Sequence, residues 1–174
     1  MNLPPKLELN DEVIIIAPAR KVELESLEFA EKLLLKWGLK PVRSKNIMCN
    51  FGIFAGSDLE RKQDLQWALD HPSAKAIWCF RGGYGSIQLL KELSPANFLI
   101  NPKWIIGFSD ITTIHCFSNI ILNTASVHAT MPINVSKNTP TTLDSLKKFL
   151  FKEKISYKIK SSIDNISGNI KAPL

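Results

Sequence analysis

The sequence predicts an α/β fold: a doubly wound, mostly parallel sheet flanked by helices, like Rossmann and flavodoxin-like folds, in a single domain. Short apolar runs alternate with longer amphipathic runs about six times, which is the pattern of successive strand and helix units. The first apolar run, residues 13–17, is continuous and β-branched, as expected of a strand buried on both faces. With 174 residues, 45% of them hydrophobic, the chain can bury one sizeable core.

Three elements are predicted first along the chain. The strand at 13–17 ends at Pro18, which donates no hydrogen bond to a sheet. Apolar residues then recur at helical spacing over 23–37, and Gly38 ends that helix. Residues 40–44 form a plausible short second strand.

The middle of the chain adds a second helix and a third strand. Residues 46–56 are rich in small and turn-forming residues and are expected to form a loop. Ser57 begins a helix that runs to about residue 70, because Glu60 three residues later completes a capping box. Residues 75–80 are the next strand.

The remaining elements repeat the alternation of strand and helix. We expect helices over 86–93, 110–122 and 141–151, and strands over 104–108, 125–131 and 155–159.

The formal charge of +6 arises from 22 Lys and Arg against 16 Asp and Glu. Much of the excess lies in the last thirty residues, where lysines alternate with apolar residues, as on the solvated face of a helix or an edge strand. No cluster of arginines with interleaved aromatic residues appears. We therefore expect no nucleic-acid partner.

The cysteines and the first residues of the chain indicate a cytoplasmic protein. Cys49, Cys79 and Cys116 are odd in number, widely spaced and without a CxxC pair, which favours a reducing compartment over disulfides or a zinc site. No apolar stretch follows a basic N-terminus, so no signal peptide is visible, and the apolar runs are too short to span a membrane. The sequence implies no metal and no cofactor.

A serine occupies the turn after the strand at 104–108. Gly107-Phe108-Ser109-Asp110 places Ser109 between a strand and a helix, in the manner of a nucleophile elbow. An oxyanion formed there could accept the N–H of Asp110 at the helix N-terminus. The other interpretation is that Ser109 or Asp110 simply caps the helix. The motif also departs from G-x-S-x-G, because Ile111 replaces the second glycine.

A glycine-rich turn follows the strand at 75–80. Arg81-Gly82-Gly83-Tyr84-Gly85 has three glycines in five residues, so bare backbone N–H groups could hold a phosphate, a carboxylate or an oxyanion. The turn could equally be a tight connection that needs positive φ. It matches neither G-x-G-x-x-G nor a P-loop.

The three histidines do not supply an evident base for Ser109. His71 precedes a proline at a helix end, and His115 lies about a turn and a half beyond Ser109 on the same helix, so it should point elsewhere. His128 on the next strand could approach the site, although a role in the core or behind the site is the alternative. No Ser–His–acid set assembles within the chain.

Together these segments resemble the LD-carboxypeptidases, the serine peptidases that trim murein tetrapeptides, and their microcin-immunity relatives. The resemblance covers about residues 9–132 and depends on several blocks that occur in order. These blocks are residues 10–19, residues 54–58 with Arg61 and 64–65, residues 75–79, 81–85, 102–103 and 106–112, and His128 with 131–132.

The resemblance implies that Ser109 is the nucleophile and that the backbone N–H groups of Gly83 and Asp110 form the oxyanion hole. The resemblance also implies that the complete enzyme hydrolyses the bond between an L-centre and a terminal D-alanine in murein tetrapeptides, through an acyl-enzyme. The residues expected to shape or contact the substrate are Arg81, Gly82, Tyr84 and His128. His128 is followed by Ala-Thr-Met, where the family usually has Gly-Pro-Met.

Family members are close to twice this length, and their catalytic Glu and His come from a C-terminal domain. The resemblance therefore implies that residues 1–167 are the N-terminal domain and that 168–174 begin the linker to a C-terminal domain absent from this chain. Such a domain alone is expected to be inactive.

Two other functions remain open at this point. The chain could be a non-catalytic module whose glycine-rich turn binds an anion or a nucleotide. It could also be a domain that exposes a former interdomain surface and self-associates as a homodimer.

Overall fold

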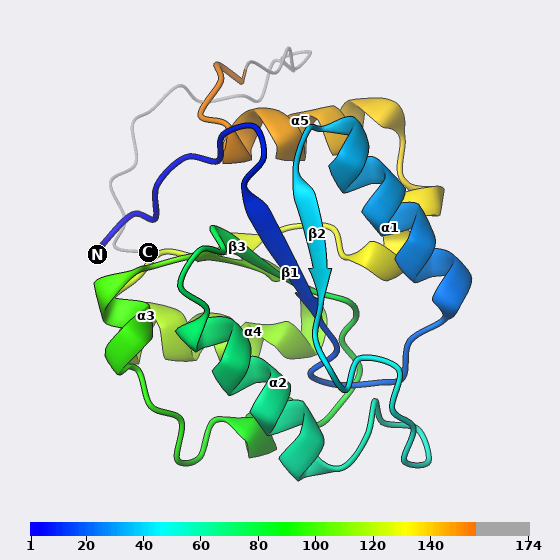
Figure 1. Ribbon diagram of the computed structural model, residues 1–174, viewed down its shortest axis with the longest axis vertical. Coiled ribbons are helices and arrows are strands. Elements are labelled where there is room, and N and C mark those ends of the chain that lie inside the picture. Colours follow the sequence, from blue (N-terminus) through cyan, green and yellow to red (C-terminus); the bar gives the residue numbers. More distant parts are fainter. Residues whose placement is uncertain (156–174) are drawn as a thin grey trace, which may run out of the picture.

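Five parallel strands form one sheet in the computed structural model, which describes residues 1–155 (Figure 1). The strand order is β2-β1-β3-β4-β5. The chain winds outward from β1 in one direction to β2 and in the other to β3, β4 and β5, so the predicted doubly wound parallel sheet is confirmed. The strands are β1 (Glu12–Ile16), β2 (Lys40–Arg43), β3 (Ala76–Cys79), β4 (Trp104–Gly107) and β5 (Val127–His128).

Helices cover both faces of the sheet, which gives three layers (Figure 1). One face is covered by α1 (Leu24–Lys36), the 3₁₀ helix η4 (Pro132–Lys137) and α5 (Pro140–Leu150). The other face is covered by α2 (Asp58–Asp70), α3 (Ala96–Ile100) and α4 (Thr112–Cys116). No helix in residues 1–155 is both long and apolar enough to cross a membrane.

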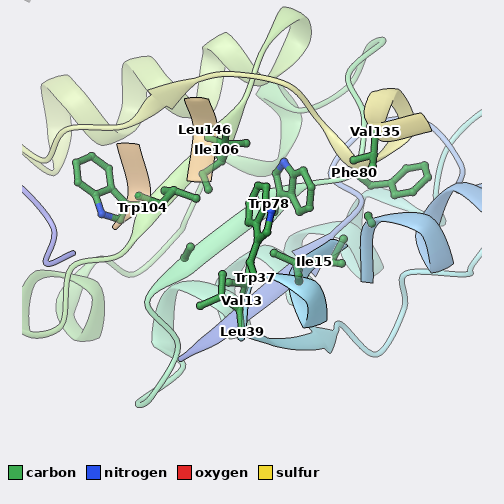
Figure 2. Packing of buried hydrophobic residues seen from close by; sticks show 14 of the residues in the cluster. Val13, Ile15, Trp37, Leu39, Trp78, Phe80, Trp104, Ile106, Val135 and Leu146 are labelled. Carbon is green, nitrogen blue, oxygen red and sulfur yellow. The ribbon is translucent and has the colours of Figure 1, made fainter. Parts of the chain in front are cut away.

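The side chains on the two faces of the sheet belong to two separate hydrophobic clusters, because successive side chains of a strand point to opposite faces. Val13 and Ile15 pack toward α1 and α5, whereas Ile14 and Ile16 pack toward α2 and α4. Trp78 of β3 and Trp37 both belong to the cluster on the first face (Figure 2). A continuous apolar run was therefore the correct signal for a strand buried on both sides.

Several predicted elements hold closely. The helix after Ser57 has the predicted capping box, with Ser57 Oγ accepting the N–H of Glu60 and the Glu60 carboxylate accepting the N–H of Ser57. The first four predicted strands and the helices at 23–37 and 141–151 agree with the structure to within one or two residues at most ends.

The predicted helix over 86–93 is wrong. Only the three-residue 3₁₀ helix η1 (Ile87–Leu89) forms there. The hydroxyl of Ser86 donates to the carbonyl of Asp110 and so does not cap a helix, and Glu92 has a positive φ of 65° that stops helical growth. The helix α3, which begins just after Pro95, was not predicted.

The segment predicted as one helix over 110–122 is helical but changes its hydrogen-bonding pattern twice. It begins as the 3₁₀ helix η2 (Ser109–Ile111), continues as α4 and ends as the π-helix η3 (Phe117–Ile121). The strand predicted over 125–131 is shortened to β5, because β4 ends at Gly107 and offers no partner further along. The predicted strand at 155–159, apart from Ile155, and the predicted linker at 168–174 lie outside the described residues.

Candidate functional site

Ser109 stands on a sharp turn at the carboxyl end of β4. Its backbone has a φ of 63°, an uncommon value for a residue other than glycine, and the residue is exposed. Gly107 allows this turn, because a Cβ there would lie 2.8 Å from Cγ2 of Ile111, the residue that ends η2. The chain therefore presents the Ser109 hydroxyl at the edge of the sheet where ligands bind in this fold class.

The glycine-rich turn after β3 packs directly against Ser109. A Cβ added to Gly82 would lie 3.2 Å from Ser109 Oγ, 3.1 Å from Ser109 Cβ and 3.1 Å from the backbone nitrogen of Asp110. Strands β3 and β4 are hydrogen-bonded neighbours, so their carboxyl ends bring the two turns together. The turn that carries Ser109 and the glycine-rich turn thus lie next to each other and form one candidate site.

Two backbone N–H groups beside Ser109 are available to a ligand. Neither the amide of Gly83 nor that of Asp110 donates a hydrogen bond to any acceptor within residues 1–155. Gly83 is exposed and has a φ of 135°, a conformation that side chains disfavour. Donors of this kind at a turn and a helix start can stabilise an oxyanion.

The carboxylate and carbonyl of Asp110 bond to Ser86 and connect the two turns. Asp110 Oδ2 accepts the N–H of Ser86 at 3.0 Å, and the Asp110 carbonyl accepts the Ser86 hydroxyl at 2.7 Å. Ser86 is fully buried directly after the glycine-rich turn. These bonds fix the position of the turn against the helix start.

Arg81 and Tyr84 lie on the outer part of the glycine-rich turn. Nη1 of Arg81 donates to Glu23 Oε1 at 2.7 Å, so its charge is already paired. Tyr84 is exposed, and its ring lies 6.5 Å from that of Phe54. The predicted substrate-contact residues of this turn therefore differ in availability, and Tyr84 is the freer of the two.

His128 and His115 approach the elbow from β5 and α4. The exposed ring of His128 lies 6.0 Å from that of Phe108, the residue before Ser109. His115 is buried, and its Nε2 lies 3.0 Å from the Gly107 carbonyl oxygen, where it acts as donor in the neutral form. Burial lowers the pKa of His115, and the hydrogen bond to Gly107 opposes this effect. Neither histidine forms a hydrogen bond to Ser109 in the described part of the chain.

A cavity of about 460 Å³ opens beside Phe108 and His128, at the carboxyl end of β5. Lys137, Asn138 and Thr142 supply polar groups to its wall. Its volume lies within the range that holds a small ligand or part of a peptide.

Sequence reasoning gave no role in the site to three of its residues. Arg20 lies across Gly83, Arg61 donates a hydrogen bond to the carbonyl of Gly85 in the glycine-rich turn, and Ser86 bonds to Asp110. A positional signal existed for Arg20, because it follows β1 at the carboxyl edge of the sheet. No local pattern marks the role of Arg61 at the turn, since the two carbonyls to which it donates lie 24 and 43 residues away and only its pair with Asp58 is local.

Residues 13–129 match the family model described as the LD-carboxypeptidase N-terminal domain. The murein tetrapeptide carboxypeptidase of Pseudomonas aeruginosa is 34% identical over 107 residues, which are 61% of this chain and 35% of that protein. A Synechocystis sp. protein named as a carboxypeptidase is 34% identical over 149 residues, 84% of this chain and 48% of that protein.

Among solved structures, an MccF-like protein from Bacillus anthracis superimposes with a TM-score of 0.76 at 30% identity. The superposition covers 86% of this chain and 47% of that one. The chain thus spans less than half the length of each of these relatives.

Proposed function

Because the chain belongs to the LD-carboxypeptidase family, matching its N-terminal domain over residues 13–129, we propose that it carries the nucleophile of a serine carboxypeptidase. The substrate class is a murein-derived tetrapeptide, and the bond broken joins an L-centre to a terminal D-alanine. The observation that carries this proposal is the contact between Gly82 and Ser109, which brings an exposed hydroxyl to the glycine-rich turn, and the amides of Gly83 and Asp110 donate no hydrogen bond within residues 1–155.

In the proposed reaction, Ser109 Oγ attacks the scissile carbonyl carbon while its proton passes to a base. The carbonyl oxygen becomes an oxyanion that accepts the N–H groups of Gly83 and Asp110. Collapse of this intermediate breaks the C–N bond, D-alanine leaves with a proton on its amine, and an acyl-enzyme remains at Ser109. Water then hydrolyses the ester and regenerates the hydroxyl.

The base is proposed to come from a C-terminal domain. His115 lies under the elbow, where its Nε2 bonds to Gly107, and His128 contacts Phe108 with no hydrogen bond to Ser109 in residues 1–155. A serine hydroxyl without a base is a weak nucleophile at neutral pH, because general base catalysis contributes roughly 10²–10⁴-fold. The 174-residue chain alone is therefore expected to show almost no turnover.

The test uses the assembled enzyme, by which we mean this chain joined to the C-terminal domain of a full-length relative. D-alanine release from a murein tetrapeptide is measured with Ser109 and with Ser109→Ala. We expect the variant to lose activity by about 10³-fold or more. Equal rates would remove Ser109 from the mechanism, and rapid release by the chain alone would show that the base lies within it.

A further inference from the structure

Arg20 is held rigidly at the carboxyl end of β1, next to the candidate site. The residues on either side of it are tied to the loop before α2: the amide of Ala55 donates to the Ala19 carbonyl at 3.1 Å, and the amide of Lys21 donates to Ile53 at 3.2 Å. Arg20 itself forms an antiparallel bridge with Phe54. The backbone from which the side chain starts is therefore fixed.

The side chain of Arg20 lies across Gly83. A Cβ at Gly83 would lie 2.7 Å from Cγ and Cδ of Arg20 and 2.8 Å from its Nε. Gly83 follows Gly82, which packs against Ser109. The Nε of the Arg20 guanidinium therefore lies against Gly83, the residue whose amide is proposed to stabilise the oxyanion.

Arg20 differs from the two other arginines around the glycine-rich turn. Arg81 pairs with Glu23, and Arg61 pairs with Asp58 and is only 2% exposed. Arg20 is exposed and, within residues 1–155, has no acidic partner and no side-chain hydrogen bond. Its charge and its donors are therefore available to a ligand.

Building on the proposed function, we propose that Arg20 binds the terminal carboxylate of the substrate. In a carboxypeptidase substrate this carboxylate lies one residue beyond the scissile carbonyl, about 4 Å along the chain. With the scissile oxygen at the Gly83 amide, the carboxylate reaches the guanidinium that lies along Gly83. The planar guanidinium can donate two parallel hydrogen bonds to a carboxylate, which a lysine cannot reproduce.

Arg20 is thus a specificity-determining residue that selects a free C-terminus on the leaving-group side. Gly83 serves this arrangement too, since any side chain there would displace the aliphatic part of Arg20.

The test measures binding to the 174-residue chain and needs no turnover. N-acetyl-D-alanine, which has the carboxylate, and N-acetyl-D-alaninamide, which lacks it, are titrated while the Gly83 amide and the Arg20 Nε–H are followed by NMR. We expect the acid to shift both signals and to bind about tenfold or more tightly than the amide. Arg20→Gln should remove this preference, whereas Arg20→Lys should keep only part of it.

Arg43→Gln is the matched control, because it removes the same charge from an arginine that pairs with Glu31 on another part of the sheet. This variant should retain the preference for the acid within twofold. Equal binding of acid and amide, an unchanged preference in Arg20→Gln, or no saturable shift with the acid would overturn the inference. If the preference holds but the assembled enzyme releases no D-alanine, the proposed function fails while the carboxylate site stands.

Discussion

Nη1 of Arg61 lies 3.1 Å from the carbonyl oxygen of Gly85, the last residue of the glycine-rich turn. The same nitrogen donates to the Pro18 carbonyl at 2.7 Å, and the guanidinium lies 4.9 Å from the centre of the Phe54 ring. One buried side chain on α2 thus joins the loops after β1 and β3. Because these loops carry Arg20 and Gly83, Arg61 fixes the outline of the candidate site from a buried position.

Replacing Arg61 with methionine should destabilise the chain. The change leaves the carbonyls of Pro18 and Gly85 without this donor inside the protein, and we expect a loss of about 2–4 kcal/mol in the free energy of unfolding. Urea unfolding of the isolated chain measures this loss. Arg43→Met is the control, since its pair with Glu31 is partly exposed and should be worth less than about 1 kcal/mol. Similar losses in both variants would contradict the structural role of Arg61.

Adding a methyl group at Gly82 should damage the site more than the fold. The new Cβ would press on the side chain of Ser109 and on the amide of Asp110, at distances of 3.1–3.2 Å. A displacement of a few tenths of an ångström there should lower D-alanine release by the assembled enzyme about tenfold or more. The free energy of unfolding should fall by only about 1 kcal/mol.

Gly52→Ala is the comparison for Gly82→Ala. A Cβ at Gly52 meets no atom within 4 Å, but its φ of 62° makes alanine unfavourable. This variant should lose about 1 kcal/mol of stability through backbone strain and keep its activity. The proposed contact would be disproved if both alanine variants released D-alanine at the rate of the unmodified protein.

The buried ammonium of Lys103 should make stability depend on pH in the alkaline range. Its Nζ donates to the carbonyls of Leu69 and Asn101 just before β4, and burial lowers the pKa of Lys103 from 10.5 to about 8. Between these values the unfolded chain binds the proton and the folded chain has released it. The free energy of unfolding therefore rises as the pH increases from 8 toward 10.5.

Lys103→Met supplies the reference for this effect because it cannot titrate. Between pH 7 and pH 9 the unmodified chain should gain about 1 kcal/mol relative to the variant, as measured by urea unfolding at each pH. Parallel pH dependences in the two proteins would show that Lys103 keeps its proton in the folded state.

The sheet was largely predictable because its signals are local. A β-branched run such as residues 13–17, or the capping pair of Ser57 and Glu60, expresses its structure within a few residues. The predicted helix over 86–93 failed for the opposite reason. A helix was predicted to begin at Ser86, but the Ser86 hydroxyl bonds to Asp110, which lies 24 residues further along.

The same difference separates the predicted and the unpredicted parts of the candidate site. The positions of Ser109 and the glycine-rich turn follow from strand ends, so their proximity could be expected before the structure. The pairing of Arg81 with Glu23 depends on side chains 58 residues apart. It leaves Arg20, which lies across Gly83, as the arginine proposed to bind the substrate, because Arg20 has no acidic partner within residues 1–155. Only tertiary structure distinguishes one arginine from the other.

The left-handed backbone of Ser109 has a consequence for how this protein can evolve. A φ of 63° costs a non-glycine residue about 1 kcal/mol, and glycine would adopt it without that penalty. Selection for heat tolerance alone would therefore favour losing the hydroxyl, whereas the proposed role of Ser109 as the nucleophile would require it. At position 109, the residue that would give the most stable fold differs from the residue that the proposed reaction requires.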